Sequence, residues 1–167
     1  MASALLLDLS RFDLSQTAYT RAQIYARLPQ RHEFMQLDRV IHLDGQRGEA
    51  IALRHVCPDE WWCKAHLPGN PLLPGVLMIE AAAQLAALMD FYSREGCEGF
   101  VGFGGVDNTK FRRTVIPPSD LWLLCRRVEL RTRRLISEVQ GVVDGELVFE
   151  TRVTGMLVPL TNTRSAR

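Results

Sequence analysis

Residues 76–95 have the sequence VLMIEAAAQLAALMDFYSRE, in which alanines stand among leucine, isoleucine and methionine. The pattern predicts one helix of roughly 20 residues, about 30 Å long at 1.5 Å per residue. Because nearly every side of this helix is apolar, we expect it to be buried. Its most apolar part, Val76 to Met89, is interrupted by Glu80 and Gln84 and is shorter than the roughly 20 residues that span a bilayer, so no membrane span is predicted.

The segment before this helix, residues 57–75, is rich in residues that interrupt regular structure. Each proline fixes a backbone angle and removes a hydrogen-bond donor, so an ordered loop is predicted. The residues concerned are Pro58, Pro68, Gly69, Pro71, Pro74 and Gly75.

The rest of the chain predicts a short helix and about five or six strands. Thr20 to Leu28 is expected to be helical, capped by Thr20 and ended by Pro29. A hairpin or two long strands are expected over residues 34–56 around Asp44-Gly45, with Val40, Ile41, Ile51 and Leu53 facing inward. Further strands are expected at 100–106, 120–131, 135–143 and 146–158, the last two joined by a turn at Asp144-Gly145. Strands and helices do not alternate, which favours an α+β fold: an antiparallel sheet around one central helix.

The composition is that of a globular protein: 167 residues, 47% hydrophobic, with 20 Lys and Arg against 19 Asp and Glu. We expect a single domain over residues 1–167, with an arm of uncertain structure at 1–17 and a tail at 160–167; disorder and general nucleic-acid binding are disfavoured. The apolar run from Ala4 to Leu7 is too short for a secretory signal, so a cytoplasmic protein is expected.

The irregularly spaced cysteines are expected to be reduced thiols: Cys57, Cys63, Cys97 and Cys125.

Two polar residues, His66 and Glu80, stand 14 residues apart in the predicted loop and helix. Each has an ordinary explanation by itself: an exposed or structural histidine, and a carboxylate in a buried hydrogen bond or ion pair. Pro74-Gly75 could likewise be a simple turn. Together with the free N–H groups of Gly75 and Val76 at the helix N-terminus, however, they supply a base, a second acid or base and an oxyanion site. Those are the components needed to remove a proton beside a thioester carbonyl.

The run from His66 to Val76, HLPGNPLLPGV, with Glu80 four residues later, resembles the active-site segment of the hot-dog-fold 3-hydroxyacyl-(acyl-carrier-protein) dehydratases of the FabZ type. This resemblance implies the hot-dog fold, an antiparallel β-sheet wrapped around one long α-helix. Further matching motifs follow in order: Leu28-Pro29 with Arg31, Leu37-Asp38-Arg39-Val40, Gly105-Val106-Asp107, Lys110-Phe111-Arg112-Arg113 and Val143-Asp144-Gly145.

The resemblance also implies a role for each matching residue. His66 would remove the C2 proton of a (3R)-3-hydroxyacyl thioester, and Glu80 would protonate or orient the departing hydroxyl, leaving a trans-2-enoyl thioester of fatty-acid biosynthesis. The backbone of Gly75 and Val76 would hold the thioester oxygen, and Gln84 would support Glu80 from one turn away. The resemblance implies no metal or cofactor, an acyl carrier protein as partner, and a homodimer whose subunits share each site, in many members within a trimer of dimers.

Several positions depart from the family pattern: Ala65, Leu67, Asn70, Asn108, Pro118 and Ser119. They leave the acyl chain length and the pathway open. Alternatives are therefore a dehydratase of polyketide or specialised-lipid synthesis, an acyl thioesterase, or a non-catalytic acyl-binding subunit. For Trp61 and Trp62 a core or interface role is favoured over the lining of an acyl tunnel.

Charge is unevenly distributed, because residues 110–134 contain 8 basic and 2 acidic residues. A basic surface would attract an acidic carrier protein. Lys110, Arg112 and Arg113 are the docking candidates, whereas Arg126 to Arg134 could be only a solvated strand face.

Overall fold

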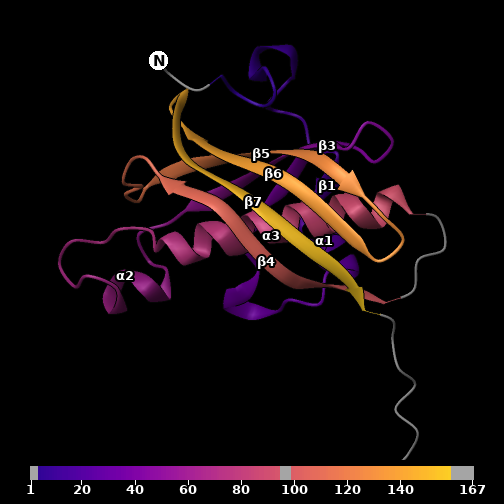
Figure 1. The fold of residues 1–167 in the computed structure, drawn as a ribbon. Helices are drawn as coiled ribbons and strands as arrows, with labels where there is room; N and C mark the ends of the chain where they lie inside the picture. The colour runs from indigo at the N-terminus through magenta and orange to yellow at the C-terminus, as the bar shows by residue number, and fades with distance from the viewer. Residues whose placement is uncertain (1–3, 95–98, 159–167) are drawn as a thin grey trace, which may run out of the picture.

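The long apolar segment forms helix α3 (Gly75–Ser93), which runs beneath a seven-stranded antiparallel sheet (Figure 1). The structure is a computed structural model and describes residues 4–94 and 99–158. Pro74 precedes the helix and accepts hydrogen bonds from the Leu77 and Met78 N–H groups at 2.9 and 3.4 Å. The buried side chains of α3 are Leu77, Met78, Ala81, Ala82, Gln84, Leu85, Ala86, Ala87, Leu88, Met89 and Asp90. The predicted hot-dog arrangement is confirmed.

The sheet has a single antiparallel order in which β1 and β4 are the edges. From edge to edge the strands are β1 (Tyr19–Thr20), β2 (Arg39–Asp44), β3 (Glu49–Val56), β5 (Ser119–Leu130), β6 (Arg134–Val143), β7 (Glu146–Val158) and β4 (Phe100–Phe111). The other elements are α1 (Arg21–Arg27), α2 (Trp61–Ala65) and the 3-10 turns η1 (Leu9–Arg11) and η2 (His32–Phe34).

Most predicted elements are confirmed. The sheet has seven strands instead of five or six, and β4 continues to Phe111 instead of ending at residue 106. Thr20 caps α1 through a reciprocal hydrogen-bonded box with Gln23. Asp144 and Gly145 have φ angles of 51° and 78°, as a tight hairpin turn requires. The prediction of an ordered loop over 57–75 is wrong for residues 61–65, which form the short helix α2.

Helix α3 is a core helix. By length and composition alone the helix could cross a membrane, but 61% of its most apolar 18-residue stretch is buried inside the fold. At its far end Gly45, in the β2–β3 turn, touches the backbone of Tyr92; a Cβ atom there would lie 2.5 Å from the Tyr92 carbonyl oxygen. The turn therefore needs a glycine to close against the helix.

The described cysteines are free: Cys57, Cys63 and Cys125. Burial raises the pKa of the Cys125 thiol to about 12, so this group stays protonated and unreactive at neutral pH. Cys97 and the tail at 160–167 lie outside the described residues.

The N-terminal arm covers the face of the sheet opposite α3 (Figure 1). Leu7 is buried there, against Ile41, Ile51 and residues of β5 and β6. The Leu6 N–H donates to Gln140 Oε1 at 2.7 Å. Both faces of the β2–β3 hairpin are thus covered. The prediction that Val40, Ile41, Ile51 and Leu53 face inward is confirmed in that all four are buried, but Ile41 and Ile51 pack against the arm, whereas Val40 packs in the cluster that contains α3.

Replacing Leu7 by Ala should lower the free energy of unfolding by about 2 kcal/mol, because the arm then loses its buried anchor. Chemical denaturation measures the change. Thr17→Ala, at an exposed position of the same arm, is the matched control and should stay within about 0.5 kcal/mol of the original protein. Equal stability of the Leu7 and Thr17 variants would contradict the packing of the arm.

Candidate active site

His66 follows α2 directly, and its ring has a defined hydrogen-bonded state. The His66 N–H donates to the Trp62 carbonyl at 2.7 Å, which ends the helix. Its Nδ1 lies 2.9 Å from the Leu72 carbonyl oxygen. Because a carbonyl can only accept, Nδ1 carries the proton in the neutral ring, and Nε2 keeps the lone pair that a general base needs.

The loop after His66 turns back sharply to reach α3. Leu67 and Gly69 have positive φ angles of 54° and 80°, and the Asn70 N–H donates to the Leu67 carbonyl at 2.9 Å. The Leu73 N–H donates to the Val115 carbonyl, also at 2.9 Å, which ties the end of the loop to the sheet side. These contacts hold the His66 side chain next to the beginning of α3.

The N-terminus of α3 offers two backbone donors. Among the described residues, the N–H groups of Gly75 and Val76 have no hydrogen-bond acceptor. The Phe111 ring lies against Gly75 so closely that a Cβ atom would be 2.6 Å from it. The end of a helix also favours negative charge, so an oxyanion is the chemistry this position suits.

Glu80 lies in the second turn of α3 and is half-buried. Its Oε1 accepts a hydrogen bond from Gln84 Nε2 at 2.8 Å, as the spacing of one turn predicts. It also accepts one from Gln30 Nε2 at 3.4 Å. Sequence reasoning missed Gln30, because nothing local connects it with a residue 50 positions away.

His66 and Glu80 line two different cavities. One cavity of about 490 Å³ is bordered by His66, Gly75, Val76 and Phe111. The other, of about 60 Å³, begins at Glu80 and Gln30 and runs between α3 and the strands β4, β6 and β7. The two share no lining residue, so one chain does not gather the acid and the base at one place.

The docking candidates lie near the end of β4 and carry ion pairs. Arg112 and Arg113 line the His66 cavity, and they pair with Glu150 at 2.6 Å and Glu146 at 2.8 Å. Lys110 is largely exposed, with its Nζ 3.9 Å from Glu150.

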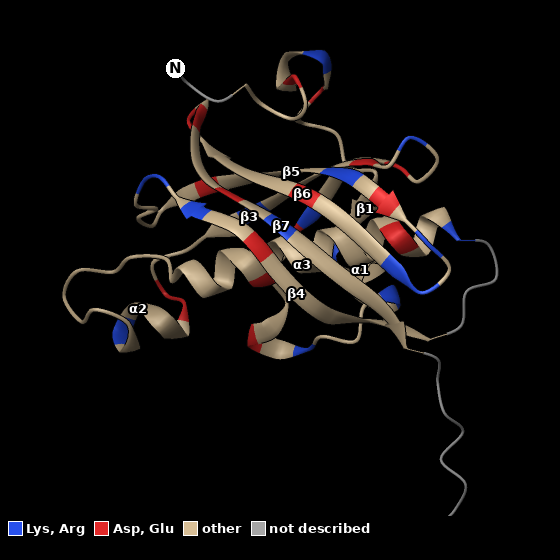
Figure 2. Cartoon of the chain, in the orientation of Figure 1, with Lys and Arg blue, Asp and Glu red and all other residues tan. Residues whose placement is uncertain are grey.

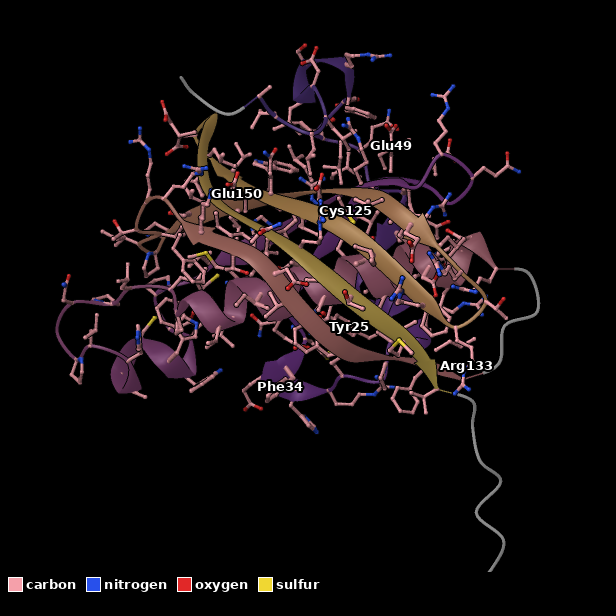
Figure 3. All side chains as sticks on the ribbon, viewed as in Figure 1. Tyr25, Phe34, Glu49, Cys125, Arg133 and Glu150 are labelled. Atoms are coloured by element: carbon pink, nitrogen blue, oxygen red, sulfur yellow. The ribbon has the colours of Figure 1, made fainter. Side chains whose placement is uncertain are left out.

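The basic residues of 110–134 do not form one patch (Figure 2). In the strand register, Lys110 of β4 lies opposite Glu150 of β7, and Arg134 of β6 lies opposite Met156 of β7. Glu150 and Met156 are six residues apart on β7, which corresponds to about 20 Å along the strand. Glu150 and Arg133 accordingly lie at opposite ends of the sheet (Figure 3). Only the group near Glu150 adjoins the His66 cavity.

An ion pair between a buried arginine and a half-buried glutamate anchors the segment that leads to His66. Arg54 is 3% exposed, and its guanidinium binds both carboxylate oxygens of Glu60, at 3.2 and 2.7 Å. Glu60 also accepts from the indole N–H of Trp62 at 2.9 Å. Trp62 is fully buried, which confirms a core role, whereas Trp61 is exposed.

Comparisons with known proteins identify the family of the chain and several of its relatives. Residues 28–152 match the model of a family described as the FabA-like domain. The chain is 36% identical over 149 residues to a protein of Brucella abortus (strain S19) named 3-hydroxyacyl-(acyl-carrier-protein) dehydratase FabZ, covering 87% of this chain and 94% of the relative. A protein of the same name from Polynucleobacter necessarius is 35% identical over 127 residues, covering 76% and 85%.

Solved structures support the fold. The dehydratase heterocomplex ApeI:P from Xenorhabdus doucetiae is similar with a TM-score of 0.70 at 16% identity, covering 82% of this chain and 91% of that one. The TT0310 protein from Thermus thermophilus has a TM-score of 0.59 at 21% identity, covering 77% and 100%.

Proposed function

The chain belongs to the FabA-like family, and from that membership we propose that it dehydrates 3-hydroxyacyl chains carried on acyl carrier protein, as a carbon–oxygen lyase of fatty-acid biosynthesis. The relatives named FabZ support the reaction, since they match most of the chain. The observation that carries the proposal in the structure is the His66 ring, whose Nδ1 donates to Leu72 and whose Nε2 is left as a base beside the free N–H groups of α3.

The proposed reaction assigns one task to each group. His66 Nε2 takes the proton from C2 of the acyl chain, and the charge that develops on the thioester oxygen is stabilised by the N–H groups of Gly75 and Val76. The C3–O bond then breaks, and the departing hydroxyl takes a proton from Glu80 and leaves as water. The C2 electron pair forms the double bond of the trans-2-enoyl thioester. The residues are restored when the proton on His66 returns to Glu80 through solvent.

We propose further that two chains build each site. His66 and Glu80 line separate cavities, and β4, which borders the Glu80 cavity, is an edge strand with exposed Phe103 and Val106. A homodimer that brings the His66 cavity of one chain to Glu80 of its partner would complete the acid–base pair.

The free thiols support a reducing, cytoplasmic setting for such an enzyme.

His66→Ala and Glu80→Gln should each lower kcat for 3-hydroxyacyl carrier protein by about 10²–10⁴-fold, because each removes a proton-transfer group. Mass spectrometry of the carrier-bound acyl chain follows loss of water. His55→Ala is the matched control, since the exposed ring of this histidine contacts Asp120 at the surface, and it should keep full activity. No dehydration by the unmodified protein would refute the proposed reaction; undiminished rates for both variants would refute only the residue assignment.

Co-expression of the His66→Ala and Glu80→Gln chains should restore about a quarter of the normal activity if subunits share sites. Half of the dimers are then mixed, and each mixed dimer has one site with an intact His66 and an intact Glu80. Activity is measured on the purified mixture, with each variant alone as a control. Sites contained within single chains would give no recovery.

The double variant Arg112→Glu/Arg113→Glu should raise KM for the carrier-bound substrate by about tenfold and flatten its dependence on salt, because the charges that attract an acidic partner are reversed. The matched control is Arg47→Glu, an exposed arginine of the β2–β3 turn, which should leave KM unchanged. An unaltered KM and salt dependence in the double variant would rule out docking at this surface.

A further inference from the structure

The Gln84 side chain is 1% exposed, and both of its polar atoms are engaged. Its Oε1 accepts hydrogen bonds from the Tyr25 hydroxyl at 2.7 Å and from the Gln36 backbone N–H at 3.1 Å. Its Nε2 donates to the Phe34 carbonyl at 2.6 Å and to Glu80 Oε1 at 2.8 Å. Gln84 therefore connects Glu80 with α1 and with the backbone between η2 and β2.

The polarity of two of these partners decides which way the Gln84 amide faces. The N–H of Gln36 can only donate and the carbonyl of Phe34 can only accept. Turning the amide over would bring two donors together at the buried Gln36 N–H and two acceptors together at the Phe34 carbonyl. The amide must therefore direct an N–H group at Glu80.

The Tyr25 hydroxyl supports the Gln84 amide by donating one hydrogen bond and accepting another. Its hydroxyl accepts from the Leu37 N–H at 2.8 Å, so its single proton is free to be donated to Gln84. Burial raises the pKa of the Tyr25 hydroxyl, so the group keeps this proton at neutral pH. Tyr25 and Phe34 come from separate segments of the chain (Figure 3). The tyrosine thus holds the amide and also the backbone segment that orients the amide.

The consequence for Glu80 is that its two oxygens differ. Oε1 accepts from Gln84 and from Gln30, whereas Oε2 has no hydrogen bond to any residue that the structure describes. A proton on Oε1 would face these amide donors, so the protonated carboxyl carries its proton on Oε2.

We propose, on the basis of the dehydratase function proposed above, that Tyr25 is a positioning residue: acting through Gln84, it keeps Glu80 Oε1 as a hydrogen-bond acceptor, so that Oε2 delivers the proton to the departing hydroxyl. Tyr25 does not touch the reacting atoms. It determines which oxygen of the acid faces them.

Tyr25→Phe in the full chain tests this proposal, because it removes the hydroxyl and keeps the ring. We expect kcat with 3-hydroxyacyl carrier protein to fall about tenfold while KM changes less than about twofold, since binding of the acyl chain does not involve Tyr25. Tyr19→Phe is the matched control: the Tyr19 ring packs on Tyr92, near the other end of α3, with ring centroids 4.8 Å apart. This variant should keep the original kcat.

A second pair of variants separates positioning from a general structural effect. In a Gln84→Leu background, adding Tyr25→Phe should cause no further fall in kcat, because the tyrosine then has no amide to orient. All assays are run well below the thermal midpoint of each variant. An unchanged kcat for Tyr25→Phe, or the same fold loss in both backgrounds, would overturn the proposal. Absence of dehydration by the unmodified protein would instead overturn the proposed function.

Discussion

Burial of α3 against the sheet is the constraint on which the rest of the structure depends. A polar group on a buried helix must find a partner inside the protein, because water cannot replace it. Asp90, 2% exposed, meets this requirement with Arg94 at 2.9 Å, although burial still raises the pKa of its carboxyl. Glu80, in the second turn, and Gln84, at the middle of the helix, meet it through their own hydrogen bond and through partners in α1 and η2. The chain around the helix is thus arranged by the few polar residues that the helix carries.

Elements specified by local signals could be predicted from the sequence, and those that depend on distant partners could not. The cap at Thr20 and the turn at Asp144-Gly145 each use neighbouring residues, so their patterns are visible in a short window. Helix α2 was missed, because prolines dominate the surrounding loop. The sequence predicts no structure for the arm, because Leu7 is buried against strands far away in the sequence.

The candidate site shows the same division between local and distant information. Motif and spacing placed His66, Glu80, Gly75, Val76 and Gln84 in the loop and helix where the structure has them. The resemblance already implies that subunits share each site, but which strands border the Glu80 cavity and which residues border the His66 cavity follow from the fold and could not be predicted from the motif. The charge count predicts one basic region for residues 110–134, but strand pairing places Lys110 beside Glu150 and Arg134 beside Met156, six residues apart on β7.

One polar network connects Glu80 with the start of α2, the short helix that precedes His66. Glu60, at the start of α2, binds Arg54, and Arg54 Nε donates to the Gln36 side chain at 2.9 Å. The backbone of Gln36 then donates to Gln84, which binds Glu80. Because α2 leads directly to His66, Gln36 joins the segment before His66, through its side chain, to the carboxylate of Glu80, through its backbone and Gln84. In a dimer with shared sites, His66 and Glu80 of one chain would belong to two different sites. The network within each chain would therefore link the His66 half of one site to the Glu80 half of the other.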